Sequence, residues 1–210
     1  VAAYQRLISN GADSIVSAHL SSEISGTFES ALLASRSVSC PIAVIDSRGI
    51  AMMLGFAVQA GAQLAKSGGD FAEVGDLIKR KSLGSSIFFY VDSLEFLERG
   101  GRINAVQARM GTAMNLKPIL HMINGKVEQR ELVRTREKAL NRMVDLVCAA
   151  ARIKSQIAVH HVAAPSVAED LAKQLRIRTG LNDIAVSAVG AVVGTHVGPG
   201  AIAIVVSPQV

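Results

Sequence analysis

The residues near the start of the chain that are best suited to chemistry lie between His19 and Ala31, in the stretch HLSSEISGTFESA. This stretch contains four hydroxyl side chains and one glycine, namely Ser21, Ser22, Ser25, Thr27 and Gly26. The aliphatic residues before it predict a buried strand over 13–20, and those after it predict a helix over 28–35. A strand that leads through a Ser/Gly loop into a helix directs free backbone N–H groups at one point, which can bind a phosphate or carboxylate. The alternative is an ordinary helix start that is capped by Ser25 or Thr27.

Three residues farther along the chain also have side chains that bind anions. His196 ends a predicted strand over 192–196 and precedes a rigid Gly-Pro-Gly corner. Arg134 stands at a strand-to-helix junction, where a guanidinium can bind a carboxylate or phosphate through two parallel hydrogen bonds. Arg102 follows two glycines on a short loop. Each also has a simpler explanation: an incidental histidine in a tight turn, a solvated arginine, or the termination of a helix.

Several common active sites lack their sequence signatures. Ser25, His196 and Asp46 are the residue types of a catalytic triad, but the GxSxG elbow is absent. His160 and His161 are neighbours on a predicted strand, so their side chains leave opposite faces and cannot bind one metal ion together. Neither of the Gly-rich phosphate loops, GxxxxGK[ST] and GxGxxG, occurs. The remaining hydroxyl, imidazole and guanidinium groups favour holding an acid over breaking a bond, without a metal or cofactor.

The composition favours a well-buried α/β protein. The 210 residues are 50% hydrophobic and include 18 glycines, which suits one large or two small domains. The first eight residues predict an amphipathic helix and not a signal peptide, and no apolar run is long enough to span a membrane. Two widely separated cysteines, Cys40 and Cys148, favour a reducing cytosol, so we expect a cytoplasmic protein. The absence of an initial methionine suggests that the natural sequence begins upstream.

Nucleic-acid binding is disfavoured by the same composition. The net charge of +5 is modest and its basic residues are scattered, while only 4% of residues are aromatic and able to stack on bases. A regulator that contacts nucleic acid through these basic residues remains an alternative, which a steep salt dependence of binding would support.

The first half of the chain predicts a parallel, doubly wound sheet. A strand over 42–46 is followed by helical patterns over 51–65 and 70–80, and this alternating order places ligands at the carboxyl ends of the strands. Asp46-Ser47 and Asp92-Ser93 look like the same device, a strand end that leads into a capped helix. The apolar run 50–58 could line a lipid tunnel or could simply be core.

The second half predicts a mixed sheet. A strand over 87–92 and a helix over 94–99 precede a hairpin, in which Asn124-Gly125 joins strands 117–123 and 126–133. The remaining predicted elements are helices 135–151 and 165–178 and strands 156–162, 184–189, 192–196 and 201–206. We therefore predict an N-terminal doubly wound α/β/α domain over 1–85 and a two-layer α/β domain over 86–210.

Six segments in this order resemble the DegV family, and together they cover nearly the whole chain. They are SSEISGTF (21–28), IDS (45–47), LERGGRI (97–103), LKPI (116–119), VRT (133–135) and THVGPG (195–200). The resemblance implies a two-domain DegV-like fold. It also implies similarity to the fatty-acid-binding subunit of bacterial fatty acid kinase, which serves phospholipid synthesis. Family members also have an N-terminal strand with an Asp-Ser motif and a Thr-Ser-Gln-Pro loop, both absent from this chain.

The same resemblance assigns roles to individual residues. A subunit of this kind encloses one long-chain fatty acid and presents its carboxyl group to a separate ATP-binding kinase subunit, with no catalytic activity of its own and peripheral or no membrane contact. Ser25, Gly26, Arg134 and His196 would bind the carboxylate, and Arg102 would face the kinase partner. The enzyme alternative is a self-sufficient phosphotransferase or hydrolase that uses the same Ser/His pocket.

Overall fold

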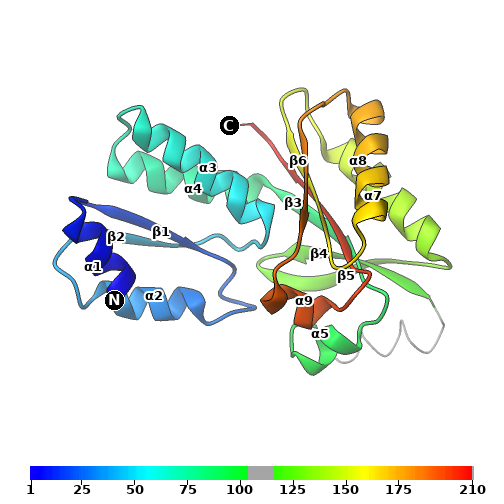
Figure 1. Ribbon diagram of the computed structural model, residues 1–210, viewed down its shortest axis with the longest axis horizontal. Helices are drawn as coiled ribbons and strands as arrows, with labels where there is room; N and C mark the ends of the chain where they lie inside the picture. The colour runs from blue at the N-terminus through cyan, green and yellow to red at the C-terminus, as the bar shows by residue number, and fades with distance from the viewer. Residues whose placement is uncertain (104–115, 210) are drawn as a thin grey trace. The chain divides into compact units, whose positions relative to one another are not determined.

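The computed structural model describes residues 1–103 and 116–209, and these form two compact units, Val1–Gly84 and Ser85–Gln209. Each unit has its own sheet with helices packed against it (Figure 1). Among the described residues, every helix is too short or too polar to cross a lipid bilayer.

Unit 1 is a parallel strand pair between two pairs of helices (Figure 1). Strands β1 (Ile15–His19) and β2 (Ile42–Asp46) pair in register, with His19 opposite Asp46. Two helices lie on each side of the strands: α1 (Ala2–Ser9) and α2 (Thr27–Ser35) on one, α3 (Met52–Lys66) and α4 (Phe71–Gly84) on the other.

Alternate residues of the two strands build the two cores of unit 1, as expected for strands covered on both faces. Ile15 packs with Tyr4 and Ala31 on the side of α1 and α2. Ile45 packs on the opposite side with a set from α3 and α4, namely Ala57, Val74 and Ile78. Within the apolar run 50–58, Ala57 lies in this core and Met53 and Phe56 are also buried, whereas Ala51 and Val58 are exposed.

Unit 2 contains a six-stranded mixed sheet in the order β5-β4-β3-β8-β6-β7. Its strands are β3 (Ser86–Tyr90), β4 (Lys117–Ile123), β5 (Lys126–Val133), β6 (Gln156–His161), β7 (Ile184–Ala188) and β8 (Ile202–Ser207). The β6–β7 pair is parallel and the other pairs are antiparallel. Its helices are α5 (Glu95–Arg99), α7 (Arg136–Ala150), α8 (Pro165–Thr179) and α9 (Ala191–Val197).

The main core of unit 2 lies between one face of this sheet and helices α7 and α8. It includes a set of fully buried side chains from both layers, among them Tyr90, Ile119, Met143, Val159, Leu175 and Ile204. Burying each such side chain contributes about 1.5–3 kcal/mol. Helices α7 and α8 therefore hold the sheet in a fixed shape, and the loops at the ends of its strands can position functional groups.

The α/β class with a mixed sheet is confirmed, and so is the hairpin with its bounds at 117–123 and 126–133. Asn124 and Gly125 both have positive φ, 50° and 84°, as a two-residue type I′ turn requires. The predicted strand over 192–196 is wrong, because these residues form helix α9. They have no neighbouring strand in the described sheet, and Val192 is 78% exposed, so the β-branched residues there are not sheet residues.

Candidate functional site

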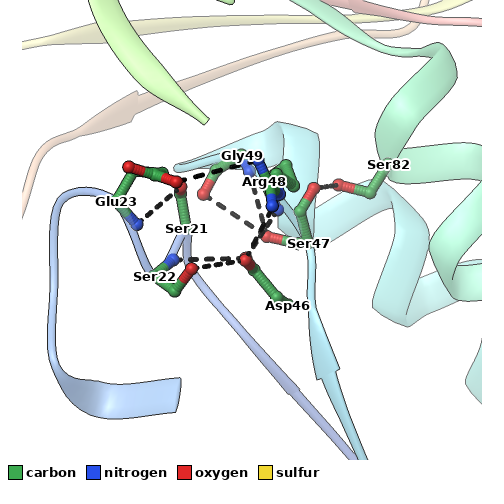
Figure 2. A network of polar contacts seen from close by, with 8 residues as sticks. All are labelled: Ser21, Ser22, Glu23, Asp46, Ser47, Arg48, Gly49 and Ser82. Carbon is green, nitrogen blue, oxygen red and sulfur yellow. Dashed lines mark hydrogen bonds and ion pairs between the residues drawn. The ribbon is translucent and has the colours of Figure 1, made fainter. Parts of the chain in front are cut away.

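In unit 1, the loops that follow β1 and β2 are joined by Asp46 (Figure 2). Its carboxylate accepts hydrogen bonds from the hydroxyl of Ser22 at 2.6 Å and from the backbone amide of Ser22 at 3.2 Å. The backbone amide of Arg48 donates to the same carboxylate at 2.9 Å, and the Arg48 guanidinium lies 3.5 Å from it. Asp46 thus ties the Ser-rich loop to the strand beside it, and it does not cap a helix as we predicted.

The environment of Asp46 favours its ionised form. Partial burial raises the pKa of the carboxyl group, but the hydrogen bonds from Ser22 and Arg48 and the positive charge of Arg48 outweigh this, so that the net pKa lies below its ordinary value. The carboxylate is therefore a fixed negative charge beside the loop, and it is already saturated with donors from its own chain. It serves to position the loop and is not itself a receptor for an acid.

Buried serine residues also hold the loops that follow β1 and β2 in place. The hydroxyl of Ser82 donates to the carbonyl of Ser47 at 2.6 Å, and the amide of Ser47 donates to the carbonyl of His19 at 3.0 Å. The amide of Ser21 donates to the carbonyl of Gly49 at 2.9 Å. Because the side chains of Ser21, Ser47 and Ser82 are fully buried, the loop leading to Ser25 leaves the sheet at a fixed position.

Ser25 stands at the start of α2, and its hydroxyl contacts Thr27. The amide of Thr27 donates to Ser25 Oγ at 3.3 Å, and the two hydroxyls are 3.1 Å apart. The simpler explanation, a serine that satisfies a helix start, therefore describes part of its role. A hydroxyl can make about three hydrogen bonds, so the half-buried Ser25 keeps capacity for a ligand beside the exposed N-cap residue, Gly26.

In unit 2, two residues predicted from separate motifs come together at Gly100. His196 lies in the last turn of α9, and a methyl group added at Gly100 would overlap its Nδ1 atom. Arg102 Nη1 donates a hydrogen bond to the carbonyl of the same glycine. Gly100 is the C-cap of α5, so the contact between α5 and α9 sets the position of the imidazole.

The Gly-Pro-Gly corner after His196 requires both of its glycines. Gly198 and Gly200 have φ values of 76° and 79°, which side-chain-bearing residues rarely adopt. Added methyl groups would overlap the ring of Phe96 at Gly198 and the carboxylate of Asp92 at Gly200. The backbone of the Gly-Pro-Gly corner is therefore restricted to one conformation, and the position of His196 depends on that conformation.

Tyr90, Asp92 and Arg136 support this corner, and our reading of the sequence did not identify them as a group. The hydroxyl of Tyr90 donates to Asp92 at 2.5 Å, and Arg136 Nη2 donates to the carbonyl of Gly200 at 3.3 Å. The Arg136 guanidinium also lies 5.8 Å from the centre of the Tyr90 ring, a cation–π distance. Burial and the bond to Asp92 raise the pKa of Tyr90, so it remains a neutral donor. Only the Asp92-Ser93 motif signalled this cluster in the sequence.

Arg134 is exposed at the junction between β5 and α7. The next residue, Thr135, caps α7 by accepting a hydrogen bond from the amide of Lys138 at 3.2 Å. Within residues 1–103 and 116–209 the guanidinium of Arg134 has no hydrogen-bond or ion-pair partner. Arg136, two residues later, bonds the corner after His196, which places the Arg134 junction at the same end of the sheet as that corner.

The predicted carboxylate-binding set therefore spans both units. Arg102 and His196 meet at Gly100 in unit 2, and Arg134 lies at a junction bonded to the same corner. Ser25 and Gly26 belong to unit 1. That all of these groups converge on one acid stays a prediction.

The two adjacent histidines on β6 face different partners. His160 Nδ1 lies 2.9 Å from the hydroxyl of Ser187 on β7, whereas His161 Nδ1 accepts a hydrogen bond from the amide of Ala164 at the start of α8. The described residues contain no cluster of three or more His, Cys, Asp or Glu side chains able to hold a metal ion, and Cys40 and Cys148 are free thiols.

Comparison with known proteins gives a consistent family assignment. A family model described as an uncharacterised protein, DegV family, matches residues 1–209. A DegV domain-containing protein of Streptomyces coelicolor is 46% identical over 208 residues, which are 98% of this chain and 74% of that protein. The protein DegV of Bacillus subtilis is 35% identical over 210 residues, covering 97% of this chain and 74% of that protein.

Solved structures give the same result for the fold. DegV of Bacillus subtilis, described as a fatty acid binding protein, superimposes with a TM-score of 0.88 at 31% identity, over 99% of this chain and 75% of that one. A DegV family protein of Thermus thermophilus, whose structure is described in terms of fatty acid binding, gives 0.89 at 28% identity, over 99% and 75%. A DegV family protein of Corynebacterium glutamicum gives 0.91 at 26% identity, over 100% and 81%.

Proposed function

The chain belongs to the DegV family, and from this premise we propose that it encloses a long-chain fatty acid and holds the carboxylate with Ser25, Gly26, Arg134 and His196. The observation that carries the proposal is the fixed position of His196, which is set by Gly100 on one side and by the Gly198–Gly200 corner on the other. Relatives with the same fold are described as fatty acid binding, which supports the same ligand class here.

The donor set suits a carboxylate that has to remain reactive. A buried carboxylate needs hydrogen-bond donors, because an unpaired buried charge is costly. The hydroxyl of Ser25, the imidazole of His196 and the guanidinium of Arg134 can supply such bonds, and a carboxylate oxygen held in this way keeps a lone pair for a phosphoryl donor. A C16 acyl chain gains on the order of 12 kcal/mol gross on burial, before the costs of association are subtracted. The acyl chain of the ligand therefore supplies most of the binding affinity, and the contacts with the carboxylate fix its orientation.

The finer part of the proposal is that the bound acid is presented to a separate ATP-dependent kinase subunit, which forms the acyl phosphate. Arg102 is the residue assigned to that partner. Its bond to the Gly100 carbonyl, beside the His196 ring, supports a role next to the head group. In this scheme the chain alone does not catalyse the transfer.

The ligand is tested by mass spectrometry of the lipid that copurifies with the protein. The double variant Ser25→Ala/His196→Ala is expected to retain at least tenfold less fatty acid, with an unchanged circular dichroism spectrum. The matched control is Ser35→Ala/Thr195→Ala, because each hydroxyl bonds only to a carbonyl of its own helix. Equal lipid in the double variant and the wild type would contradict the proposed head-group site.

The proposed partnership is tested separately, by measuring the formation of acyl phosphate when an ATP-binding fatty acid kinase subunit is added to the lipid-loaded protein. Arg102→Ala is expected to keep its lipid and to lose most of the turnover, whereas Arg99→Ala, an exposed arginine of the preceding helix turn, is expected to keep both. Full turnover by Arg102→Ala would refute its role. Hydrolysis of ATP or of an ester by the isolated chain, lost in Ser25→Ala, would instead support the enzyme alternative.

A further inference from the structure

Among the residues that the structure describes, only β1 pairs with strand β2, and the backbone of β2 shows which residues face away from β1. Pro41 accepts a hydrogen bond from the amide of Ile15, and the amide of Ser47 donates to His19, so the odd-numbered residues from 41 to 47 bond to β1. Alternate residues of a parallel strand direct their backbone groups to opposite sides. The N–H and C=O groups of Ile42 and Val44 therefore point away from β1, and the described part of the chain pairs β2 with β1 alone.

This edge opens into a groove of about 640 Å³, here called the β2 groove. Residues 43–46 of β2 line it, together with Phe28 of α2 and several residues of α4. The α4 residues that line the groove are Phe71, Ala72, Gly75, Asp76, Lys79 and Leu83. Natural sheets usually protect an edge with lysine, proline or a bulge, and the segment IAVID has none of these within it. The edge is thus suited to receive another strand.

The fold directs any strand preceding α1 to the other edge of the sheet. Helices α1 and α2 lie on the same side of unit 1, as the contact of Tyr4 with Ala31 also shows. Connections between parallel strands are almost always right-handed, so a strand before α1 and the strand after α2 lie on opposite sides of β1. Such a strand would therefore extend the sheet beside β1. It would not cover the β2 groove.

We propose that the β2 groove binds the β2 strand of a second copy of this chain, antiparallel and around a two-fold axis near Val44. The charges of α4 are complementary under that symmetry. Asp76 and Lys79 line the groove, are exposed, and make no ion pair or hydrogen bond within the described residues of their own chain. A two-fold axis that runs α4 antiparallel to its copy brings Lys79 of each chain toward Asp76 of the other.

The spacing and the apolar residues agree with this partner. Helix α4 packs over both strands through Val74 and Ile78, and strands lie about 4.8 Å apart, so the axis places the two copies of α4 about 10 Å from each other. That is the usual distance between packed helices. Leu83 is 57% exposed in one chain, and the same symmetry covers it with the region of Ala72 in the other.

Sedimentation equilibrium on the lipid-loaded protein, from micromolar to near-millimolar concentration, tests the proposal. We expect a reversible dimer, weakened at least tenfold by Asp76→Lys and by Lys79→Asp, because each change places like charges opposite each other. An equimolar mixture of the two variants is expected to recover the wild-type affinity, since the mixed pair restores both contacts. Lys66→Asp, an exposed reversal at the end of α3, is the matched control and leaves the dimer unchanged.

Amide exchange of Ile42 and Val44, followed by NMR, gives an independent result. We expect fast exchange at low concentration and protection as the dimer forms, with the inward amides of Ala43 and Ile45 protected throughout. A protein that stays monomeric, a dimer that ignores both charge reversals, or slow exchange of Ile42 and Val44 in the monomer would overturn the proposal. The last outcome would mean that another segment or partner already covers the edge.

Discussion

Asp46-Ser47 in unit 1 and Asp92-Ser93 in unit 2 both stand at the end of a strand, Asp46 as the last residue of β2 and Asp92 two residues after β3, and their carboxylates have different partners. Asp46 collects backbone amides and a hydroxyl from the two loops beside it. Asp92 accepts the hydroxyl of Tyr90 and lies against the backbone of Gly200. The first carboxylate organises a loop by hydrogen bonds, and the second fixes a corner by close packing.

The same Asp-Ser motif can therefore position a loop in two physical ways, by hydrogen bonds to the carboxylate or by close packing against it. Hydrogen bonds to a charged group lose strength when that group is protonated, whereas close packing against glycine is insensitive to pH. The corner at Gly200 should therefore be the more sensitive of the two to added volume, and the corner at Asp46 should be the more sensitive to acid.

The largest expected effect comes from Gly200→Ala. The new methyl group overlaps Asp92 and forces a φ of 79° on a side-chain-bearing residue, so we expect a loss of about 3 kcal/mol in the stability of unit 2. Hydrogen exchange read by mass spectrometry reports that stability unit by unit. Gly180→Ala is the control, because its φ is 73° but the space around it is open. A loss no greater than that of the control would remove the packing argument.

A buried imidazole gives unit 2 its own acid sensitivity. Burial, with a smaller contribution from the charge of His161, lowers the pKa of His160 to about 4, so the unfolded chain binds a proton there at higher pH than the folded chain. Unit 2 should be fully stabilised above pH 6.5 and should lose this contribution between pH 6.5 and 4. The same exchange measurement in His160→Gln is expected to show a flatter pH profile. If the stability of unit 2 depends on pH in the same way in His160→Gln as in the wild type, His160 is not the source of the acid sensitivity.

Asp46→Asn is expected to cost unit 1 about 2 kcal/mol at pH 7, because it weakens charge-assisted bonds to Ser22 and Arg48. The pKa of Asp46 is lowered on folding, so this stability is present above the ordinary carboxyl pKa and disappears as the pH falls through the lower folded value. Urea titrations at pH 7 and pH 3 measure both effects. A variant that loses as much at pH 3 as at pH 7 would show that the charge is irrelevant.

The smallest expected effect is that of Ser93→Ala. Its hydroxyl accepts only the amide of Glu95 at 3.2 Å on an exposed turn, so we expect a loss of about 0.5–1 kcal/mol. Differential scanning calorimetry should show a shift of a few degrees at most. A loss as large as that of Gly200→Ala would mean that the Asp92 corner depends on its hydrogen bonds after all.

Local patterns predicted much of the fold. The hairpin follows from Asn124-Gly125, whose positive φ values favour those two residue types, and β1 and β2 follow from short aliphatic runs. The error at α9 arose because Val192 and Val193 have β-branched side chains, whereas these residues form a helix in which no residue is buried. Propensity is a weak guide where the tertiary structure decides.

The candidate site was predictable only in part, for a similar reason. Ser25 and His196 stand out by their neighbours in the sequence. The support of His196 by Asp92, Arg136 and Gly100 depends on contacts between residues up to about a hundred positions apart, which no local pattern records. The role of Asp46 was misjudged because two of its donors, the amide and the hydroxyl of Ser22, come from the loop after β1.

The central proposal is that Ser25 and His196 bind the carboxylate of a fatty acid, and NMR of bound palmitate labelled with ¹³C at its carboxyl carbon tests it most directly. We predict one carboxyl resonance, shifted from that of free palmitate, and a further shift in both Ser25→Ala and His196→Ala. A carboxyl resonance that is identical in the wild type and in both variants would contradict the account.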